Sequence, residues 1–385
     1  MVLYSKFYNE ILPNESKIYF DASYLYNFQS ACYNLISKKN HHYFIDPVTF
    51  KFQYGGDRAF YLNYIKYFNE FRGLFNKENI INLEFLDDPD NFNDIYKKII
   101  RFQRTMLAKT HIPIDYYKAI ASGRKDVKSF NPIENLEFII SPYFEFYRIN
   151  DDYYNYTLKY SLVEPENYCV LRFPKEILFD PDNVKKIIKD FNNSKGILIN
   201  VLELDQYNRN DLNLHFENLI DLIYNFNSNN QKVLLMNNSE FGKYFKYFGL
   251  ASVCSNVLIG QKTSNYEPFR GNKRGGSTDF IYIPQIERSV SITNGESLIT
   301  RNKKLKKIFP EHIRNMNLNS RIENYLISIK KKIDKVKHST VKIIVQELDN
   351  FSKQITFNLH KKNYNYINIW KEILIKKYKK YLERI

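Results

Sequence analysis

Short apolar runs recur along the first 260 residues of the chain, and polar or turn-forming residues bound each of them. Near-continuous apolar runs of a few residues are typical of parallel strands that are buried on both faces. There are eight such runs, at residues 17–20, 43–45, 83–86, 136–140, 168–173, 196–204, 232–236 and 255–260. The pattern therefore predicts eight buried strands.

The segments between these runs have the apolar spacing of amphipathic helices. Segment 22–39, for example, places Tyr24, Phe28, Cys32 and Leu35 on one helical face. Alternating strands and helices predict an α/β fold with a parallel sheet, and eight strands favour a (β/α)8 body like a TIM barrel. A doubly wound open sheet is the alternative. The chain has neither GxGxxG nor GxxxxGK[ST], which argues against the nucleotide-binding version of that alternative.

Two regions do not fit a simple barrel. Residues 143–166 alternate apolar and polar positions, and they predict either a β-hairpin that turns at 149–152 or an aromatic-rich helix in place of the fourth barrel helix. Residues 261–280 are polar and contain glycines, which indicates a loop. The run that follows is expected to be an edge or irregular strand, because Pro284 has no N–H to donate.

The charge of the chain is concentrated at one end. Residues 301–385 contain 22 Lys and Arg but only 7 Asp and Glu, a net charge of +15 that equals the net charge of the whole chain. This region has helical spacing, so we expect a neutral barrel-like domain over 1–300 and a basic helical region over 301–385. A basic appendage on a neutral body indicates a polyanionic partner. Nucleic acid, either tRNA or DNA, is the expected one, and docking of a protein partner by these helices is the alternative.

The cysteines and the lengths of the apolar runs indicate which cofactors and which cellular location to expect. Cys32, Cys169 and Cys254 lie far apart and form no zinc spacing, so we expect reduced thiols, no metal and no cofactor. No run approaches the eighteen residues of a transmembrane helix, and residues 1–17 do not resemble a signal peptide. The expected location is the cytoplasm, without a membrane partner.

Candidate catalytic residues are those that would lie at the C-terminal face of a barrel, where strands end. Asp21, Asp46 and Asp87 follow the first three apolar runs, while Arg172 and Glu203 lie inside the fifth and sixth. Turn or helix-capping roles are the alternative for the aspartates. Asp46 stands out because the following proline has no N–H for it to cap. A buried guanidinium at Arg172 needs either a carboxylate or a bound anion.

One loop is the best candidate for binding phosphate. It combines cations with glycines that permit close approach of the backbone, and it follows the eighth run, where barrel phosphate sites often lie. Its candidate residues are Lys262, Arg270, Lys273, Arg274, Gly275 and Gly276. An ordinary surface loop would have a similar composition.

These features favour a barrel-like protein that binds nucleic acid through its basic tail and acts on it, or on a nucleotide, at a carboxylate-lined mouth. By architecture alone, such a body resembles that of the tRNA-guanine transglycosylases. That family's C-terminal zinc motif needs clustered cysteines, which residues 255–385 lack, so no family residue is carried over. One alternative is a non-catalytic barrel scaffold in a larger complex, such as a mobile-element or defence system. Another is a small-molecule barrel enzyme whose basic tail reflects composition only.

Overall fold

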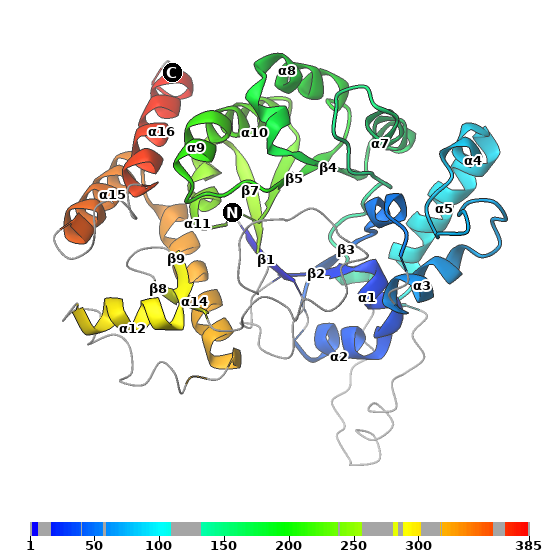
Figure 1. Cartoon of the computed structure of the whole chain (residues 1–385), viewed down its shortest axis with the longest axis horizontal. Helices are drawn as coiled ribbons and strands as arrows, with labels where there is room; N and C mark the ends of the chain where they lie inside the picture. The colour runs from blue at the N-terminus through cyan, green and yellow to red at the C-terminus, as the bar shows by residue number, and fades with distance from the viewer. Residues whose placement is uncertain are drawn as a thin grey trace, which may run out of the picture.

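A computed structural model gives the arrangement of most of the chain (Figure 1). It describes residues 2–6, 17–39, 41–56, 59–108, 132–237, 239–255, 280–283, 288–301, 316, 318–356 and 366–383. The candidate phosphate loop, Lys262 to Gly276, lies outside the described residues, as does the apolar run 256–260 that was expected to form most of the eighth strand.

Seven parallel strands form the main sheet, in the order β3-β2-β1-β7-β6-β5-β4. Their bounds are β1 Val2–Lys6, β2 Lys17–Asp21, β3 Tyr43–Asp46, β4 Tyr168–Pro174, β5 Gly196–Leu202, β6 Lys232–Met236 and β7 Leu250–Ser255. The prediction of an α/β fold with a parallel sheet is confirmed. A closed eight-stranded barrel is not found among the described residues, because β3 and β4 stand at the two ends of the strand order.

Helices surround the strands in Figure 1. The α-helices of the body are α1 Ala22–Asn27, α2 Gln29–Lys39, α3 Ala59–Ile65, α4 Leu83–Asp87, α5 Pro89–Thr105, α7 Asp152–Val163, α8 Pro181–Asp190, α9 Arg209–Asp211, α10 Glu217–Ser228, α11 Ser239–Gly242 and α12 Ile292–Arg301. Helical segments of other types are η1 Thr49–Gln53, η2 Lys66–Phe68, η3 Pro132–Asn135, η4 Lys175–Phe179, η5 Leu212–Phe216 and η6 Lys243–Phe248. The segment η5 is a π-helix, the others are 3-10 helices.

Several predicted elements differ from the structure. Residues 83–86 belong to helix α4 and not to a strand, because the Asn82 side chain accepts a hydrogen bond from the N–H of Glu84 and starts a helix there. Residues 152–163 form helix α7, capped by Asp151, so the helical alternative for this region holds. Residues 280–291 form an antiparallel hairpin of β8 Phe280–Ile283 and β9 Arg288–Ser291, separate from the main sheet.

An irregular segment, residues 136–146, lies between the two end strands of the sheet and contacts both. Isolated parallel bridges join Tyr43 to Leu136, Ile140 to Tyr168, and Glu145 to Arg172. At one end, the N–H of Glu137 donates to the carbonyl of Tyr43 at 2.9 Å, and at the other the N–H of Phe146 donates to the carbonyl of Arg172 at 3.1 Å. We call residues 136–146 the linking segment.

Side chains from neighbouring helices hold the linking segment in place of a regular strand partner. The Gln103 amide, for example, donates to the carbonyl of Ile140 at 2.7 Å and accepts from its N–H at 2.9 Å. The pairs of this kind are Gln103 with Ile140, Gln53 with Glu145, and Thr49 with Tyr143. Each satisfies both backbone groups of a buried residue, which buried backbone requires. The irregular path is therefore specified by sequence.

A row of stacked aromatic rings identifies one face of the sheet. Tyr19 on β2 stacks on Phe44 of β3 with ring centroids 5.4 Å apart, Phe44 stacks on Phe138 at 4.7 Å, and Phe138 stacks on Tyr168 of β4 at 4.0 Å. Gly196 on β5 continues the row, since a Cβ there would meet the Tyr168 ring. We call this the aromatic face. Side chains at every second residue of a strand lie on the same face, so this row orients each strand.

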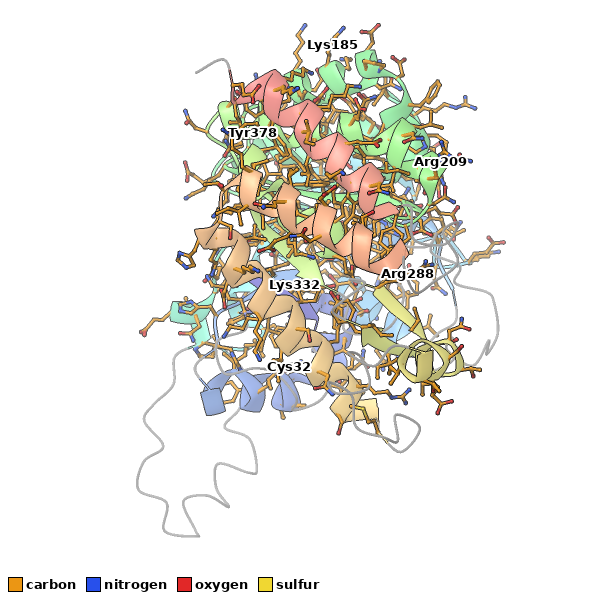
Figure 2. The ribbon with its side chains drawn as sticks, turned by 90° about the vertical axis from the view of Figure 1, so that its left-hand side faces the viewer. Cys32, Lys185, Arg209, Arg288, Lys332 and Tyr378 are labelled. Atoms are coloured by element: carbon orange, nitrogen blue, oxygen red, sulfur yellow. The ribbon has the colours of Figure 1, made fainter. Side chains whose placement is uncertain are left out.

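The basic C-terminal region forms helices that pack on the body: α14 Leu318–His338, α15 Val341–Thr356 and α16 Tyr366–Tyr381. Figure 2 shows them across one side of the molecule. On α16, the Trp370 side chain is fully buried, and its N–H donates to the carbonyl of Gln206 at 2.8 Å. Farther along α16, Lys377 and Lys380 pair with Asp221 of α10 at 2.6 and 2.9 Å. Part of the basic charge of this region therefore meets acidic residues of the body.

Candidate functional site

Asp21 and Asp46 lie next to each other at the carboxyl ends of neighbouring strands. They are partners in the parallel register of β2 and β3. Each follows a ring of the aromatic row by two residues, Tyr19 on β2 and Phe44 on β3, so both carboxylates lie on the aromatic face. The structure brings these two predicted site residues together at one edge of the sheet.

Asp46 is a buried carboxyl group without a cationic partner among the described residues. Its side chain is 6% exposed, and its Oδ1 accepts from the N–H of Val48 at 2.9 Å and from the Tyr143 hydroxyl at 2.8 Å. Burial raises the pKa of Asp46, and the nearby Asp21 carboxylate adds to the rise; the two hydrogen bonds and the charge of Lys51 act in the opposite direction. Asp46 therefore holds a proton more readily than an ordinary aspartate.

Asp21 has a different environment, although it is the nearest strand neighbour of Asp46. Its Oδ1 caps helix α1 by accepting from the N–H groups of Ser23 and Tyr24 at 2.9 and 3.3 Å. Its Oδ2 pairs with the Nζ of Lys51 at 2.5 Å, and Lys51 also donates to the Ser23 hydroxyl. Asp21 therefore has both the capping role that the sequence allowed and an ion pair with Lys51.

Arg172 lies on the same face, near the carboxyl end of β4. It follows Tyr168 by four residues and pairs in register with Asn200 of β5. Its Nε donates to the Oε2 of Glu145 at 2.6 Å, and its guanidinium lies 3.9 Å from the centre of the Phe50 ring. Glu145, and not one of the aspartates, is thus the counter-charge of Arg172. No described residue accepts a hydrogen bond from the two terminal nitrogens of Arg172.

Glu145 connects this ion pair with two tyrosines nearer the surface. Its Oε1 accepts from the hydroxyls of Tyr54 and Tyr147, which lie 2.8 Å from each other. Burial and the Glu145 carboxylate raise the pKa of Tyr54, and the same two causes raise that of Tyr147 to about 12. Both phenols therefore stay protonated at neutral pH and act as donors to Glu145.

Tyr143 contacts Asp46 directly and lies close to Arg172. Its hydroxyl donates to Asp46, while its backbone is held by Thr49. Burial raises the pKa of Tyr143 well above its usual value, the Asp46 charge raises it further, and the Arg172 charge opposes the rise. The Tyr143 ring also stacks on Phe50 with centroids 5.9 Å apart, and Phe50 is the ring that the Arg172 guanidinium contacts. Tyr143, on the linking segment, therefore lies between Asp46 and the Phe50–Arg172 contact.

Two of the predicted catalytic residues do not join this site. Asp87 is the last residue of helix α4, is exposed, and accepts from the Tyr156 hydroxyl. It is therefore not the end of a strand, because the run before it is helical. Glu203 follows β5 but is exposed, in a left-handed backbone conformation with φ of 53°. No described contact connects Glu203 with Asp21 or Asp46.

Sequence reasoning missed Tyr143 and Glu145. A signal for Glu145 was present, since it stands in the run PYFEFY as a single charge among aromatic residues, just as Arg172 stands inside an apolar strand. Asp46 also caps a backbone N–H although Pro47 follows it, because the N–H of Val48 is the donor.

The described residues contain no group of three or more His, Cys, Asp or Glu side chains that could hold a metal ion. None of the described helices has both the length and the apolar character needed to cross a membrane. The site offers a buried carboxyl group with a raised pKa, a neighbouring carboxyl group that is paired with Lys51, and an arginine with two nitrogens that meet no described acceptor. Comparison with protein-family models, with curated proteins and with solved structures finds no match for this chain.

Proposed function

We propose that this protein is an enzyme that breaks or exchanges the bond between a base and its sugar in a nucleotide or nucleic acid. The observation that carries the proposal is the difference between two neighbouring carboxyl groups. Asp46 is buried and has a raised pKa, whereas Asp21 is paired with Lys51. Neighbouring titratable groups whose environments move their pKa values apart are typical of sites for acid–base catalysis.

In this proposal, Asp46 is the general acid and Asp21 is the anion that meets the sugar. Cleavage of a glycosidic bond passes through a transition state with positive charge on the sugar, and a pair of carboxyl groups serves this chemistry. Asp46 gives its proton to the departing base as the bond from the sugar carbon to the nitrogen breaks, and Asp21 stabilises or binds the sugar carbon. Water or an incoming base then bonds to that carbon and returns a proton to Asp46.

A barrel-like closure of the sheet supports a common site for these residues. The linking segment lies between β3 and β4, which are the ends of the strand order, and it bonds to both. We therefore propose a (β/α)8-like body in which the linking segment takes the place of a strand. In such a body, the carboxyl ends of the strands form one mouth, where active sites of barrels lie.

The charge of the chain supports an anionic substrate. Residues 301–385 hold the whole net charge of +15, and neutralisation of phosphates by Lys and Arg drives binding of nucleic acid. On the described helices, Lys331 of α14 and Lys342 of α15 are exposed. Arg172 adds a cation at the mouth itself, with two nitrogens available for a phosphate or another oxyanion of the substrate.

The experiment compares Asp46→Asn with the control Asp182→Asn, which changes an exposed carboxylate on α8. Each full chain is incubated with tRNA, single-stranded RNA, single-stranded DNA and mononucleotides, and released or exchanged bases are detected by mass spectrometry. We expect Asp46→Asn to lower the rate by about 100-fold or more, since loss of a general acid removes that much, and Asp182→Asn to leave it unchanged. Equal rates for wild type and Asp46→Asn would contradict the proposed chemistry.

Binding through the C-terminal helices is tested by substitution and not by truncation. Removal of α16 would delete the buried Trp370 and leave the carbonyl of Gln206 without its donor. A shortened chain would therefore report on folding and not on binding. The double variant Lys331→Gln and Lys342→Gln keeps both helices. We expect it to weaken binding of tRNA or DNA and to lower the slope of log affinity against log salt by about one for each lost phosphate contact.

The alternative to an enzyme is a non-catalytic scaffold that binds nucleic acid. It requires that none of the nucleic acids or nucleotides is altered by wild-type protein while salt-dependent binding persists. That combination of results would replace the enzyme proposal with the binding one.

A further inference from the structure

Arg288, at the start of β9, is packed against aromatic rings and not against a carboxylate. Its guanidinium lies 4.7 Å from the centre of the Tyr207 ring and 5.8 Å from that of Tyr366. Among the described residues, no acceptor takes a hydrogen bond from Arg288 and no carboxylate pairs with it. The side chain is only partly exposed. A guanidinium carries five N–H donors, so its capacity for bonding an anion is unused in the described structure.

The two tyrosines belong to a rigid junction between the body and the C-terminal helices. Tyr207 lies in the loop after β5, with its N–H bonded to the Asp205 side chain at 2.9 Å, and its ring packs edge-on against Tyr366 with centroids 5.1 Å apart. Trp370, one turn after Tyr366, bonds to the carbonyl of Gln206 at 2.8 Å. Figure 2 shows Arg288 where the β8–β9 hairpin meets these helices.

The junction also contains a buried carboxyl group, that of Glu240, which is hydrogen-bonded within it. Glu240, which lies in α11 after β6, is fully buried and accepts from the side-chain amide of Gln206. The side-chain oxygen of Gln206 accepts from the N–H of Phe241 at 2.8 Å. The Phe241 ring stacks on Trp370 with centroids 4.8 Å apart. Glu240 thus has a bonding partner of its own, and the hydrogen-bonded Gln206 fixes the loop that carries Tyr207.

We propose that Arg288, packed against the rings of Tyr207 and Tyr366, binds a phosphate group of a nucleotide or nucleic acid beside the loop that follows β5. Cation–π contacts fix the orientation of a guanidinium without neutralising its charge. An arginine held in this way keeps a planar fork of donors, which matches a phosphate in bidentate geometry.

This subsite rests on the proposed function for the identity of its ligand and adds a residue that the carboxylate site does not contain. Tyr207 follows β5, whereas Asp21 and Asp46 end β2 and β3, and the strand order places β1, β7 and β6 between these strands. We therefore expect a substrate that reaches both sites to extend beyond a single nucleoside. The expected ligand is a phosphate attached to a neighbouring nucleotide.

The test uses Arg288→Gln, which removes the charge and keeps part of the packing, and Arg288→Lys, which keeps the charge and loses the planar fork. Arg209→Gln is the matched control, because Arg209 on α9 is an exposed arginine without an ion pair or aromatic stack among the described residues; Figure 2 shows it at the outer edge of the molecule. All three changes are made in the full chain that carries Asp46→Asn, so that binding is measured without turnover. The probes are inorganic phosphate, a nucleoside 5′-monophosphate and a short single-stranded oligonucleotide.

We expect Arg288→Gln to weaken oligonucleotide binding about tenfold or more and to lower the salt slope by about one, with Arg288→Lys between it and the parent chain. Weaker binding of inorganic phosphate in the same variant would identify the phosphate group as the determinant, and competition by the monophosphate would show that one nucleotide suffices. Equal losses for Arg288→Gln and Arg209→Gln, or no loss for Arg288→Gln, would overturn the subsite. Failure of the base-release assay alone would leave it intact.

Discussion

Two buried ionisable groups on the aromatic face, Arg172 and Asp46, differ in the partners that the protein gives them. Arg172 is 4% exposed and Asp46 is 6% exposed, and both lie at the carboxyl edge of the sheet. Arg172 has a buried counter-ion in Glu145. Asp46 has only a backbone N–H and a phenol, and burial raises its pKa. A buried ion with its partner fixes structure, whereas a buried acid without one has a protonation state that is easily changed.

The largest expected effect comes from removing the partner of Arg172. Glu145→Ala leaves a buried guanidinium without its counter-charge, so we expect the free energy of unfolding to fall by about 3–5 kcal/mol. Urea unfolding at neutral pH measures the change. Glu166→Ala is the control, since it breaks an exposed pair with Lys195 and should cost less than about 1 kcal/mol. Equal costs for the two variants would show that the Arg172 pair behaves as an exposed one.

A smaller effect is expected from the phenol that supports Asp46. Tyr143→Phe removes one of the two donors to a buried carboxyl group, so we expect a loss of about 1–3 kcal/mol and a further rise in the pKa of Asp46. Tyr26→Phe is the control, because the hydroxyl of Tyr26 has no partner among the described residues and its ring contacts would remain. An unchanged pKa of Asp46 in Tyr143→Phe, followed by NMR titration, would contradict the assigned contact.

The smallest effect is a pH dependence of stability that belongs to Asp46. Its pKa is raised in the folded protein, so the folded state binds the proton more tightly than the unfolded chain does. Stability from this group is therefore fully present below the unfolded value, near 3.8, and is lost as pH rises through the folded pKa. Asp46→Asn keeps an acceptor oxygen and removes this loss.

We therefore expect Asp46→Asn to gain stability relative to wild type as pH rises across that window, by about 1.4 kcal/mol for each pKa unit of the shift. Thermal unfolding between pH 3 and 8 measures the difference, with Asp182→Asn, which changes an exposed carboxylate, as the reference. A difference between Asp46→Asn and wild type that stays constant with pH would mean that Asp46 ionises as an ordinary aspartate does.

Much of the sheet could be predicted because its strands are continuous apolar runs. The runs at 17–20, 43–45, 168–173, 196–204 and 232–236 all correspond to strands of the parallel sheet. The prediction was wrong for the run at 83–86, since a four-residue apolar run fits a helix equally well and the Asn82 cap starts a helix there. It was also wrong for the run at 136–140, which forms isolated bridges and no strand, because side chains such as Gln103 take its backbone groups. Strand β1 was not predicted, because its sequence VLYSK is too short and too polar to stand out.

The candidate site was predictable only where it follows strand ends. Asp21 and Asp46 were found because each ends an apolar run, and the register of β2 and β3 then sets them side by side. Tyr143 and Glu145 lie on the linking segment, whose path depends on distant side chains such as Gln103 and Gln53. No periodicity in the sequence encodes such contacts, so this half of the site needed the structure.

The linking segment also bears on whether the protein aggregates at high concentration. Strands β3 and β4 would otherwise each present an open edge, and open edges recruit strands of other molecules. The residues that cover them have their own backbone groups taken by Gln103, Gln53 and Thr49, so at these positions they offer no ladder for an incoming strand. Three side chains that build a site thus also protect the fold from edge-to-edge aggregation.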